Sequence, residues 1–208
     1  MASSKPLFFL VSLSSFAIFQ MASASDIEIT SDFIIPSDLK GEVDGSFFTF
    51  TGMRALVGAE QLAGFKSSKA GMVEFPALNG LGVSLAFLQF PAGTINPPHS
   101  HPRSAELLFV VDGSLEVGLV DSKNKLYKQT LQTNDIFVFP KGLIHYQNNP
   151  DAKKPAIALS SFGSANPGTI SLPLSLFTSG IDDGILSKAF KIDDITTQAL
   201  KTAFAPKT

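Results

Sequence analysis

Two histidines one residue apart, followed by an acid, are the first candidates for chemistry in this chain. They lie in "NPPHSHPRSAELLFVVDG", residues 96–113, and the whole sequence has 3 histidines. In a β-strand, residues i and i+2 point to the same face, so His99 and His101 would share their surroundings. If they and Glu106 faced an apolar interior, all three would need polar partners. A divalent cation would satisfy them together.

The third histidine, His145 in "PKGLIHYQNN", follows a predicted strand. A sheet that curls on itself could bring it beside the first two. Three imidazoles and one carboxylate, with two open positions, make an octahedral nitrogen and oxygen site that suits Mn or Fe and could host Ni, Co or Zn. A small-molecule substrate would bind at the open positions. An isolated His-x-His pair is more common on a polar surface strand, but here every histidine falls into one pattern.

Composition limits the classes of function. The chain has 208 residues, a net charge of -2 and 44% hydrophobic residues, which predicts one compact apolar domain. No basic face is available for nucleic acid or an anionic membrane surface. There is no cysteine, so stability must come from the size of the core or from oligomerisation.

The N-terminus has the features of a secretory signal peptide. "MASSKPLFFLVSLSSFAIFQMASAS" has one lysine, an apolar run and an Ala-x-Ala cleavage site. The run is too short to span a hydrocarbon core of about 30 Å. We therefore expect residues 1–24 to be removed and residues 25–208 to be secreted, with no membrane span.

The remaining sequence predicts a mainly β domain. Residues 25–45 are polar and broken by Pro36 and Gly41, which indicates an extended arm. Short apolar runs separated by turns, beginning with "FFTFTGM", are typical of a sandwich or barrel. Toward the C-terminus the apolar residues take helical spacing, with Asp193 as a predicted N-cap. The apolar faces of these helices would have to be buried, for example against a neighbouring subunit.

The spacing of the glycines, histidines and acid matches two known motifs. Gly93, His99, His101, Glu106 and Gly113 occupy every fixed position of the first cupin motif. The second motif is matched by Pro140, Gly142, His145 and Asn149, with Asn134 in place of its opening glycine. The flanks "TINPPHSHPRSAEL" and "FVFPKGLIHYQNN" resemble germins and germin-like proteins of plants, and the resemblance extends through "NPGTISLPLSLF" and "LSKAFKIDD".

The resemblance implies a single cupin β-jelly-roll barrel with an N-terminal arm and a C-terminal α-helical extension. The barrel would occupy about residues 45–165 and the helical tail about 172–205. His99, His101, Glu106 and His145 match the family's metal ligands, and the metal is typically Mn, with Fe and Zn as alternatives. The family also implies a hexamer built as a trimer of dimers, located in the apoplast or cell wall.

Three departures from the germin pattern bear on structure and function. The usual cysteine pair near the mature N-terminus is missing, as in a cysteine-less branch of germin-like proteins. Oxalate-oxidising germins line their substrate pocket with two asparagines; Asn96 matches one of them, whereas Ala86 stands at the other. A methyl group cannot donate a hydrogen bond to a dicarboxylate. Asn96 also suits a turn before two prolines. The third departure is Asn134 in place of the opening glycine of the second motif, and asparagine tolerates a left-handed backbone.

Three functions remain in competition. The first is a secreted Mn superoxide dismutase that releases O2 and H2O2 in the apoplast. The second is an oxalate oxidase, which Ala86 disfavours. The third is a non-enzymatic cell-wall protein or an auxin-type ligand-binding protein. Intracellular cupin isomerases and dioxygenases share the barrel, but the predicted signal peptide argues against them.

Overall fold

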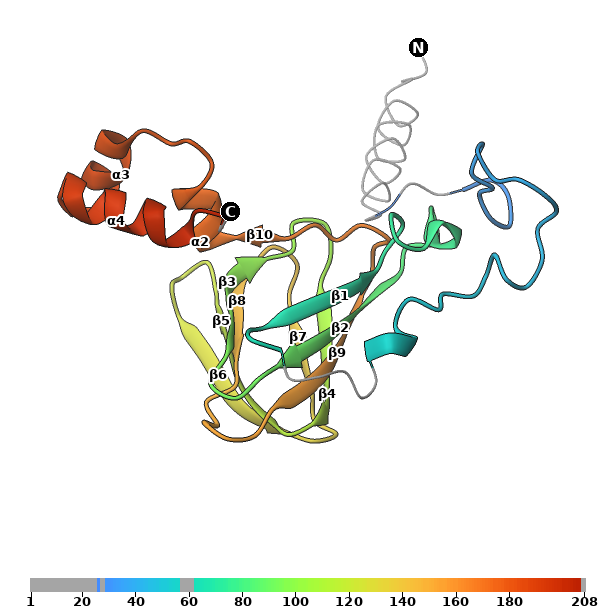
Figure 1. Cartoon of the computed structure of the whole chain (residues 1–208), viewed down its shortest axis with the longest axis horizontal. Helices are drawn as coiled ribbons and strands as arrows, with labels where there is room; N and C mark the ends of the chain where they lie inside the picture. Colours follow the sequence, from blue (N-terminus) through green and yellow to red (C-terminus); the bar gives the residue numbers. More distant parts are fainter. Residues whose placement is uncertain (1–25, 27–28, 57–61, 207–208) are drawn as a thin grey trace, which may run out of the picture.

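The computed structural model describes residue 26, residues 29–56 and residues 62–206 (Figure 1). The predicted signal peptide, residues 1–24, lies outside the described residues. Within those ranges, ten strands form two antiparallel five-stranded sheets, with orders β1-β2-β9-β4-β7 and β10-β3-β8-β5-β6. The fold is therefore mainly β, as predicted. No helix within the described ranges is long and apolar enough to cross a membrane.

The first sheet contains the strand that carries Glu106. Its members are β1 (Lys66–Ala70), β2 (Ser84–Phe90), β9 (Ala156–Phe162), β4 (Glu106–Asp112) and β7 (Ile136–Phe139). The second sheet carries His99 and His145. Its members are β10 (Ile170–Ser171), β3 (Ile95–Ser100), β8 (Ile144–Asn148), β5 (Ser114–Val120) and β6 (Leu126–Gln132).

The core lies between the two sheets. Side chains alternate in β2, whose burial pattern reverses at every residue, so one face of the strand lines the interior. The larger apolar side chains of the core that are fully buried are Phe90, Phe139, Leu108, Leu115, Val110 and Val117. Most of them fill one end of the barrel and leave the polar groups described below at the other, where Phe139, the strand partner of Glu106, packs beside those groups.

Turn residues connect the strands where the motifs require them. Gly113 joins β4 to β5 at φ 81°, and a Cβ there would lie 2.7 Å from the Pro155 carbonyl oxygen. Only glycine meets both demands. Asn134, at the position of the missing motif glycine, has φ 76°, so the predicted left-handed asparagine is confirmed.

The segment that follows the N-terminal arm differs from one expectation. "FFTFTGM" does not form a strand. Asp44 accepts hydrogen bonds from the backbone N–H and hydroxyl of Ser46, and its carbonyl accepts from Phe47, so this stretch is folded into turns. The rings of Phe33, Phe47 and Phe48 then pack on one another instead of on a neighbouring strand. A short 3-10 helix, η1 (Arg54–Leu56), follows; a second, η2 (Pro76–Leu78), precedes β2.

The arm is attached without cysteine. The Asp26 carboxylate accepts hydrogen bonds from the Ser164 hydroxyl at 2.6 Å and from the Ala165 backbone N–H at 2.8 Å. These charge-assisted contacts connect the start of the described chain to the loop after β9. They provide an attachment that the sequence alone did not reveal.

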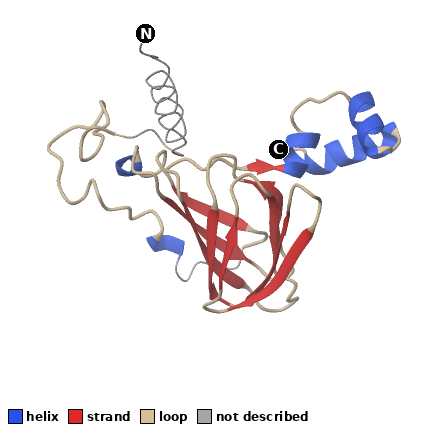
Figure 2. Cartoon of the chain, turned by 180° about the vertical axis from the view of Figure 1, so that it is seen from behind, coloured by secondary structure: helices blue, strands red, loops and turns tan. Residues whose placement is uncertain are grey.

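The C-terminal helices lie beside the barrel and not on it. Figures 1 and 2 show α2 (Leu172–Phe177), α3 (Asp183–Phe190) and α4 (Asp194–Phe204) projecting next to β10 and β3. Asp193 caps α4, since its carboxylate accepts from the Thr196 N–H at 2.6 Å, as predicted. Several large apolar side chains of these helices are exposed, including Ile185 at 60% and Ile195 at 81%.

Candidate metal centre

The strand register brings the three histidines together. His99 on β3 is the direct partner of His145 on β8, and a register shift in β3 lies between Asn96 and His99. His101 follows the end of β3 on the same chain segment. Two of the imidazoles therefore come from paired strands of one sheet and the third from the segment directly after β3, and all three residues are buried.

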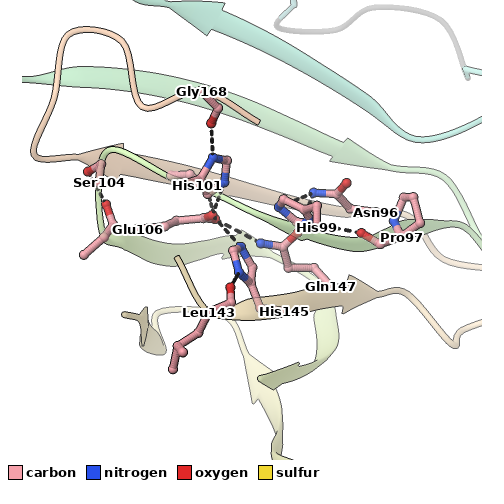
Figure 3. A network of polar contacts seen from close by, with 12 residues as sticks. Asn96, Pro97, His99, His101, Ser104, Glu106, Leu143, His145, Gln147 and Gly168 are labelled. Carbon is pink, nitrogen blue, oxygen red and sulfur yellow. Dashed lines mark hydrogen bonds and ion pairs between the residues drawn. The ribbon is translucent and has the colours of Figure 1, made fainter. Parts of the chain in front are cut away.

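The acid comes from the opposite sheet. Glu106 is the first residue of β4, is 2% exposed, and points across the interior toward the histidines (Figure 3). One potential ligand atom from each of the four residues lies within 4.8 Å of the others. The arrangement is a compact nitrogen and oxygen donor set. The first sheet alone does not supply all four donors, and neither does the second.

Backbone carbonyls fix the orientation of every ring. The Nδ1 atoms of His99, His101 and His145 lie 2.8, 2.5 and 2.8 Å from the carbonyl oxygens of Pro97, Gly168 and Leu143, respectively. A carbonyl can only accept, so each Nδ1 must carry its proton. In a neutral ring the Nε2 atom is then left with a lone pair facing the cluster, which is the tautomer of a metal-bound histidine.

The glutamate is held at one oxygen and open at the other. Its Oε1 accepts from the Gln147 amide at 2.9 Å and from the Ser160 hydroxyl at 2.6 Å. Its Oε2 faces the Nε2 atoms of His101 at 2.9 Å and His145 at 3.2 Å. Oε2 is therefore the oxygen available to a ligand, and Oε1 serves to orient the carboxylate.

The hydrogen-bonding pattern of the four residues fits a bound cation. With Nδ1 protonated on each ring, neutral histidines would direct Nε2 lone pairs at a buried carboxylate oxygen, which is repulsive. Either a proton on an imidazole or a cation between these atoms removes the conflict. A divalent ion satisfies all four groups at once, because nitrogen and carboxylate donors are its usual ligands.

The electrostatics favour an ionised Glu106 and a neutral His99. Burial by itself raises the pKa of Glu106, but in the metal-free protein hydrogen bonds from the Nε2 atoms of His101 and His145, which need a proton there, outweigh it and hold that pKa well below its usual range. Burial lowers the pKa of His99 to about 4, and the neighbouring His145 acts in the same direction. The glutamate is thus ionised and His99 neutral near pH 7.

Aromatic rings restrict the imidazoles further. Phe139 stacks on His145 with 4.3 Å between ring centroids, and Phe162 meets His101 edge-on at 4.8 Å. These contacts leave the rings little rotational freedom. The donor set is therefore held in position before any ligand arrives.

Asn96 lies beside the cluster. Its amide donates to the Gln147 side-chain oxygen at 2.6 Å and lies 3.5 Å from His99 Nε2. Gln147 in turn donates to Glu106, so an amide chain connects Asn96 to the acid. Asn149, the last residue of the second motif, has a different role, because its side chain donates to the carbonyl oxygens of Phe90, Pro91 and Lys154 and holds a loop.

Gln147 and Ser160 were not singled out from the sequence. Gln147 is two residues from His145 on β8, so strand alternation alone places the two side chains on the same face. Ser160 sits in "AIALSSF", where two serines follow each other and only the register decides which one points inward. The carbonyls of Pro97, Leu143 and Gly168 carry no sequence signal.

A cavity of about 140 Å³ opens beside the cluster. His99, His101, Glu106 and Asn96 line one side of it, and Ala86 contributes a methyl group to the wall. The remaining lining residues are Phe65, Ser67, Lys69, Gly71, Ser84, Leu85, Leu88, Ser160, Phe162, Pro167 and Thr169. The space admits only a small ligand.

Comparison with known proteins agrees with this arrangement. The Cupin family matches residues 61–198. The chain is 50% identical over 192 residues to germin-like protein 9-3 of Oryza sativa subsp. japonica, covering 89% of each chain. It is 40% identical over 170 residues to germin-like protein subfamily 2 member 4 of Arabidopsis thaliana, covering 81% of this chain and 77% of the relative.

This chain is a germin-like protein of the cupin family. Among solved structures it is similar to an oxalate oxidase in complex with the substrate analogue glycolate. That similarity has a TM-score of 0.76 and 31% identity, and covers 88% of this chain and all of the oxalate oxidase chain. The predicted family and the predicted fold class are both confirmed. The germin-like protein thus has a buried group of three histidines and one glutamate suited to a metal ion.

Proposed function

We propose that this germin-like protein binds manganese through His99, His101, Glu106 and His145 and acts as a secreted superoxide dismutase. The observation that carries the proposal is a complete donor set beside a small cavity in which Ala86 replaces one of two expected pocket amides. Manganese held there would supply the alternating one-electron chemistry that converts two superoxide ions and two protons into O2 and H2O2. Superoxide needs no pair of amides for its orientation, whereas a dicarboxylate does.

The residues of the chain would perform the supporting functions. The carbonyls of Pro97, Leu143 and Gly168 hold the imidazoles as Nε2 ligands, while Gln147 and Ser160 hold Glu106 with Oε2 forward. Asn96 is a candidate for touching the bound substrate, because it lines the cavity and its amide is already oriented by Gln147. Because the three histidines and Glu106 are buried, bulk water is kept away from their metal-binding atoms.

Oxalate oxidation is the second candidate, favoured by one specific observation. The oxalate oxidase to which this chain is similar was solved with glycolate, and Asn96 is in place in the cavity here. Ala86 opposes it, because a methyl group leaves one carboxylate of oxalate without a donor. A non-enzymatic wall protein or auxin-type receptor would use the same cavity without turnover.

Secretion and assembly complete the proposal. Residues 1–24 would direct export, and residues 25–208 would form the single mature domain in the apoplast or cell wall. The exposed apolar side chains on α3 and α4 would pack against neighbouring subunits in a hexamer of three dimers. In the hexamer, side chains such as Ile195 would be buried, so the apolar surface that is exposed in one chain would be removed from water.

The test is metal content and activity of secreted protein that was never exposed to added metal. We expect about one Mn per chain and metal-dependent dismutation, both lost in His101→Ala, with little H2O2 formed from oxalate. Dismutation that survives His101→Ala would refute the dismutase proposal. Rapid oxalate-dependent H2O2 formation would favour the second candidate. A metal-free or zinc-only protein would favour the non-enzymatic one.

A further inference from the structure

Lys69 is an exposed cation on the face of the first sheet that also carries Ala86 and Ser160. On β1, Phe65, Ser67 and Lys69 alternate along the chain, and all three line the cavity that contains His99, His101 and Glu106. The intervening Ser68 and Ala70 do not line it, as expected for side chains on the other face of the strand.

The register places Lys69 opposite the residue that departs from the germin pattern. Lys69 pairs with Ala86 on β2, and Ala86 pairs with Ser160 on β9. These three residues form one cross-strand row, with adjacent strands about 4.8 Å apart. Ser160 is one of the two residues that donate to Glu106 Oε1. The row therefore runs from the lysine, past the methyl group, to the candidate metal ligand.

The methyl group and the lysine complement each other. A side chain longer than alanine at position 86 would occupy the space between β1 and the histidines. Ala86, only 3% exposed, leaves this part of the wall open to a flexible side chain from the neighbouring strand. The donor missing at position 86 can thus be supplied from position 69, as an ammonium group instead of an amide.

The ammonium group of Lys69 has no competing partner in the part of the chain that the structure describes. The ion pairs found there involve other residues, and no hydrogen bond to the Lys69 side chain occurs. Glu74 shares an adjacent hollow with Lys69, but its carboxylate accepts from the Gly71 backbone N–H at 3.1 Å. The lysine is therefore free to meet a ligand.

We propose that Lys69 is a specificity-determining residue that selects a small anion in the cavity beside the metal centre. A positive side chain that lines a small cavity attracts anions to it and strengthens their hydrogen bonds. Under the proposed function the anion is superoxide, and the inference rests on that function for the identity of the substrate. A short carboxylate has the same charge and provides a stable probe.

The experiment compares Lys69→Met with Lys66→Met in the metal-loaded protein. Lys66 is exposed on the same strand but does not line the cavity, so it is the matched control. Calorimetric titration with glycolate measures anion binding, and titration with ethylene glycol measures binding of a neutral molecule of similar size. Metal content and circular dichroism are recorded for each variant.

We expect Lys69→Met to weaken glycolate binding about 10-fold, the usual effect of losing one charge-assisted hydrogen bond, at unchanged metal content. Lys66→Met should bind as wild type does, and Lys69→Arg should recover part of the affinity. Equal glycolate affinity in wild type and Lys69→Met would overturn the inference. So would a wild-type protein that binds glycolate no better than ethylene glycol.

The same samples separate this inference from the proposed function. If Lys69→Met weakens glycolate binding but wild type shows no dismutation, the anion selectivity stands and the dismutase proposal fails. If wild type dismutates superoxide, glycolate should inhibit it competitively, and Lys69→Met should require about 10-fold more glycolate for the same inhibition. Inhibition that is identical in both proteins counts against Lys69.

Discussion

The two ends of the barrel interior contrast sharply although the same strands build both. On β4, Glu106 is followed on the inner face by Leu108 and Val110, and all three are fully or almost fully buried. On β9 the order along the chain is reversed: the inner face carries the apolar Ala156 and Ala158 first and the polar Ser160 after them. A shift of only two residues along a strand separates a packed apolar core from a polar cluster.

The two ends are therefore stabilised in different ways. The apolar end gains from removal of hydrocarbon surface from water and from close packing. The polar end must satisfy each buried group individually, and it does so with backbone carbonyls, Gln147 and Ser160. Substitutions should therefore damage stability at one end and metal binding at the other.

Removing the charge of the glutamate should have the largest effect. Glu106→Gln keeps the size of the side chain but removes the anionic ligand, so metal affinity should fall more than about 100-fold, beyond the loss typical of residues that only support a ligand. Metal content per chain after dialysis measures this. Glu42→Gln, an exposed acid in the arm, is the control. Full metal retention in Glu106→Gln would contradict the ligand assignment.

Truncation at the apolar end should act on stability instead. Leu115 on β5 is fully buried, and Leu115→Ala should lower the free energy of unfolding by about 2–5 kcal/mol through the cavity it leaves. Metal content should stay at the wild-type level. Urea denaturation checks the first point, with Leu126→Ala, at an exposed position, as the control. Loss of metal without loss of stability would show that the two ends are not separable.

Acid should weaken the polar end of the metal-free protein. The pKa of His99 is about 4 in the folded protein, against an ordinary value of 6.5 for a histidine in an unfolded chain. Between these values the unfolded state binds more protons, so the free energy of unfolding falls as pH is lowered through this window, by at most about 3 kcal/mol. The lowered pKa of Glu106 acts in the same direction below its unfolded pKa of 4.5.

Urea denaturation of metal-free protein at pH 7 and pH 5 measures this effect. His99→Gln should flatten the dependence in that range, because it removes the buried imidazole. A wild-type protein whose stability is the same at both pH values would show that protonation of His99 is not opposed by the fold.

The smallest effect is expected from the support of the carboxylate. Ser160→Ala removes one of two hydrogen bonds to Glu106 Oε1 but leaves Gln147 in place, so metal affinity should fall about 10-fold. Ser161→Ala is the matched control, since Ser161 points to the other face of the same strand and is exposed. Competition with a metal chelator measures the affinity. Equal losses in both variants would argue against the orientation of Glu106 by Ser160.

The candidate donors, the motif spacing and the mainly β class could be predicted from the sequence, because these depend on residue type and short-range periodicity. The sequence also identified the N-cap at Asp193 and the left-handed turn at Asn134, which are local properties of the chain. It failed at "FFTFTGM", where strand propensity was high but the segment pairs with no strand in the described part of the chain. Propensity for strands is realised only through pairing and packing.

Which long-range neighbours complete the site could be seen only in the tertiary structure. The pairing of His99 with His145, the approach of Glu106 from the other sheet and the row from Lys69 through Ala86 to Ser160 all depend on register. A slip of one residue would turn each of these side chains to the opposite face. Register is set by the packing of the whole barrel, so no local stretch of sequence contains it.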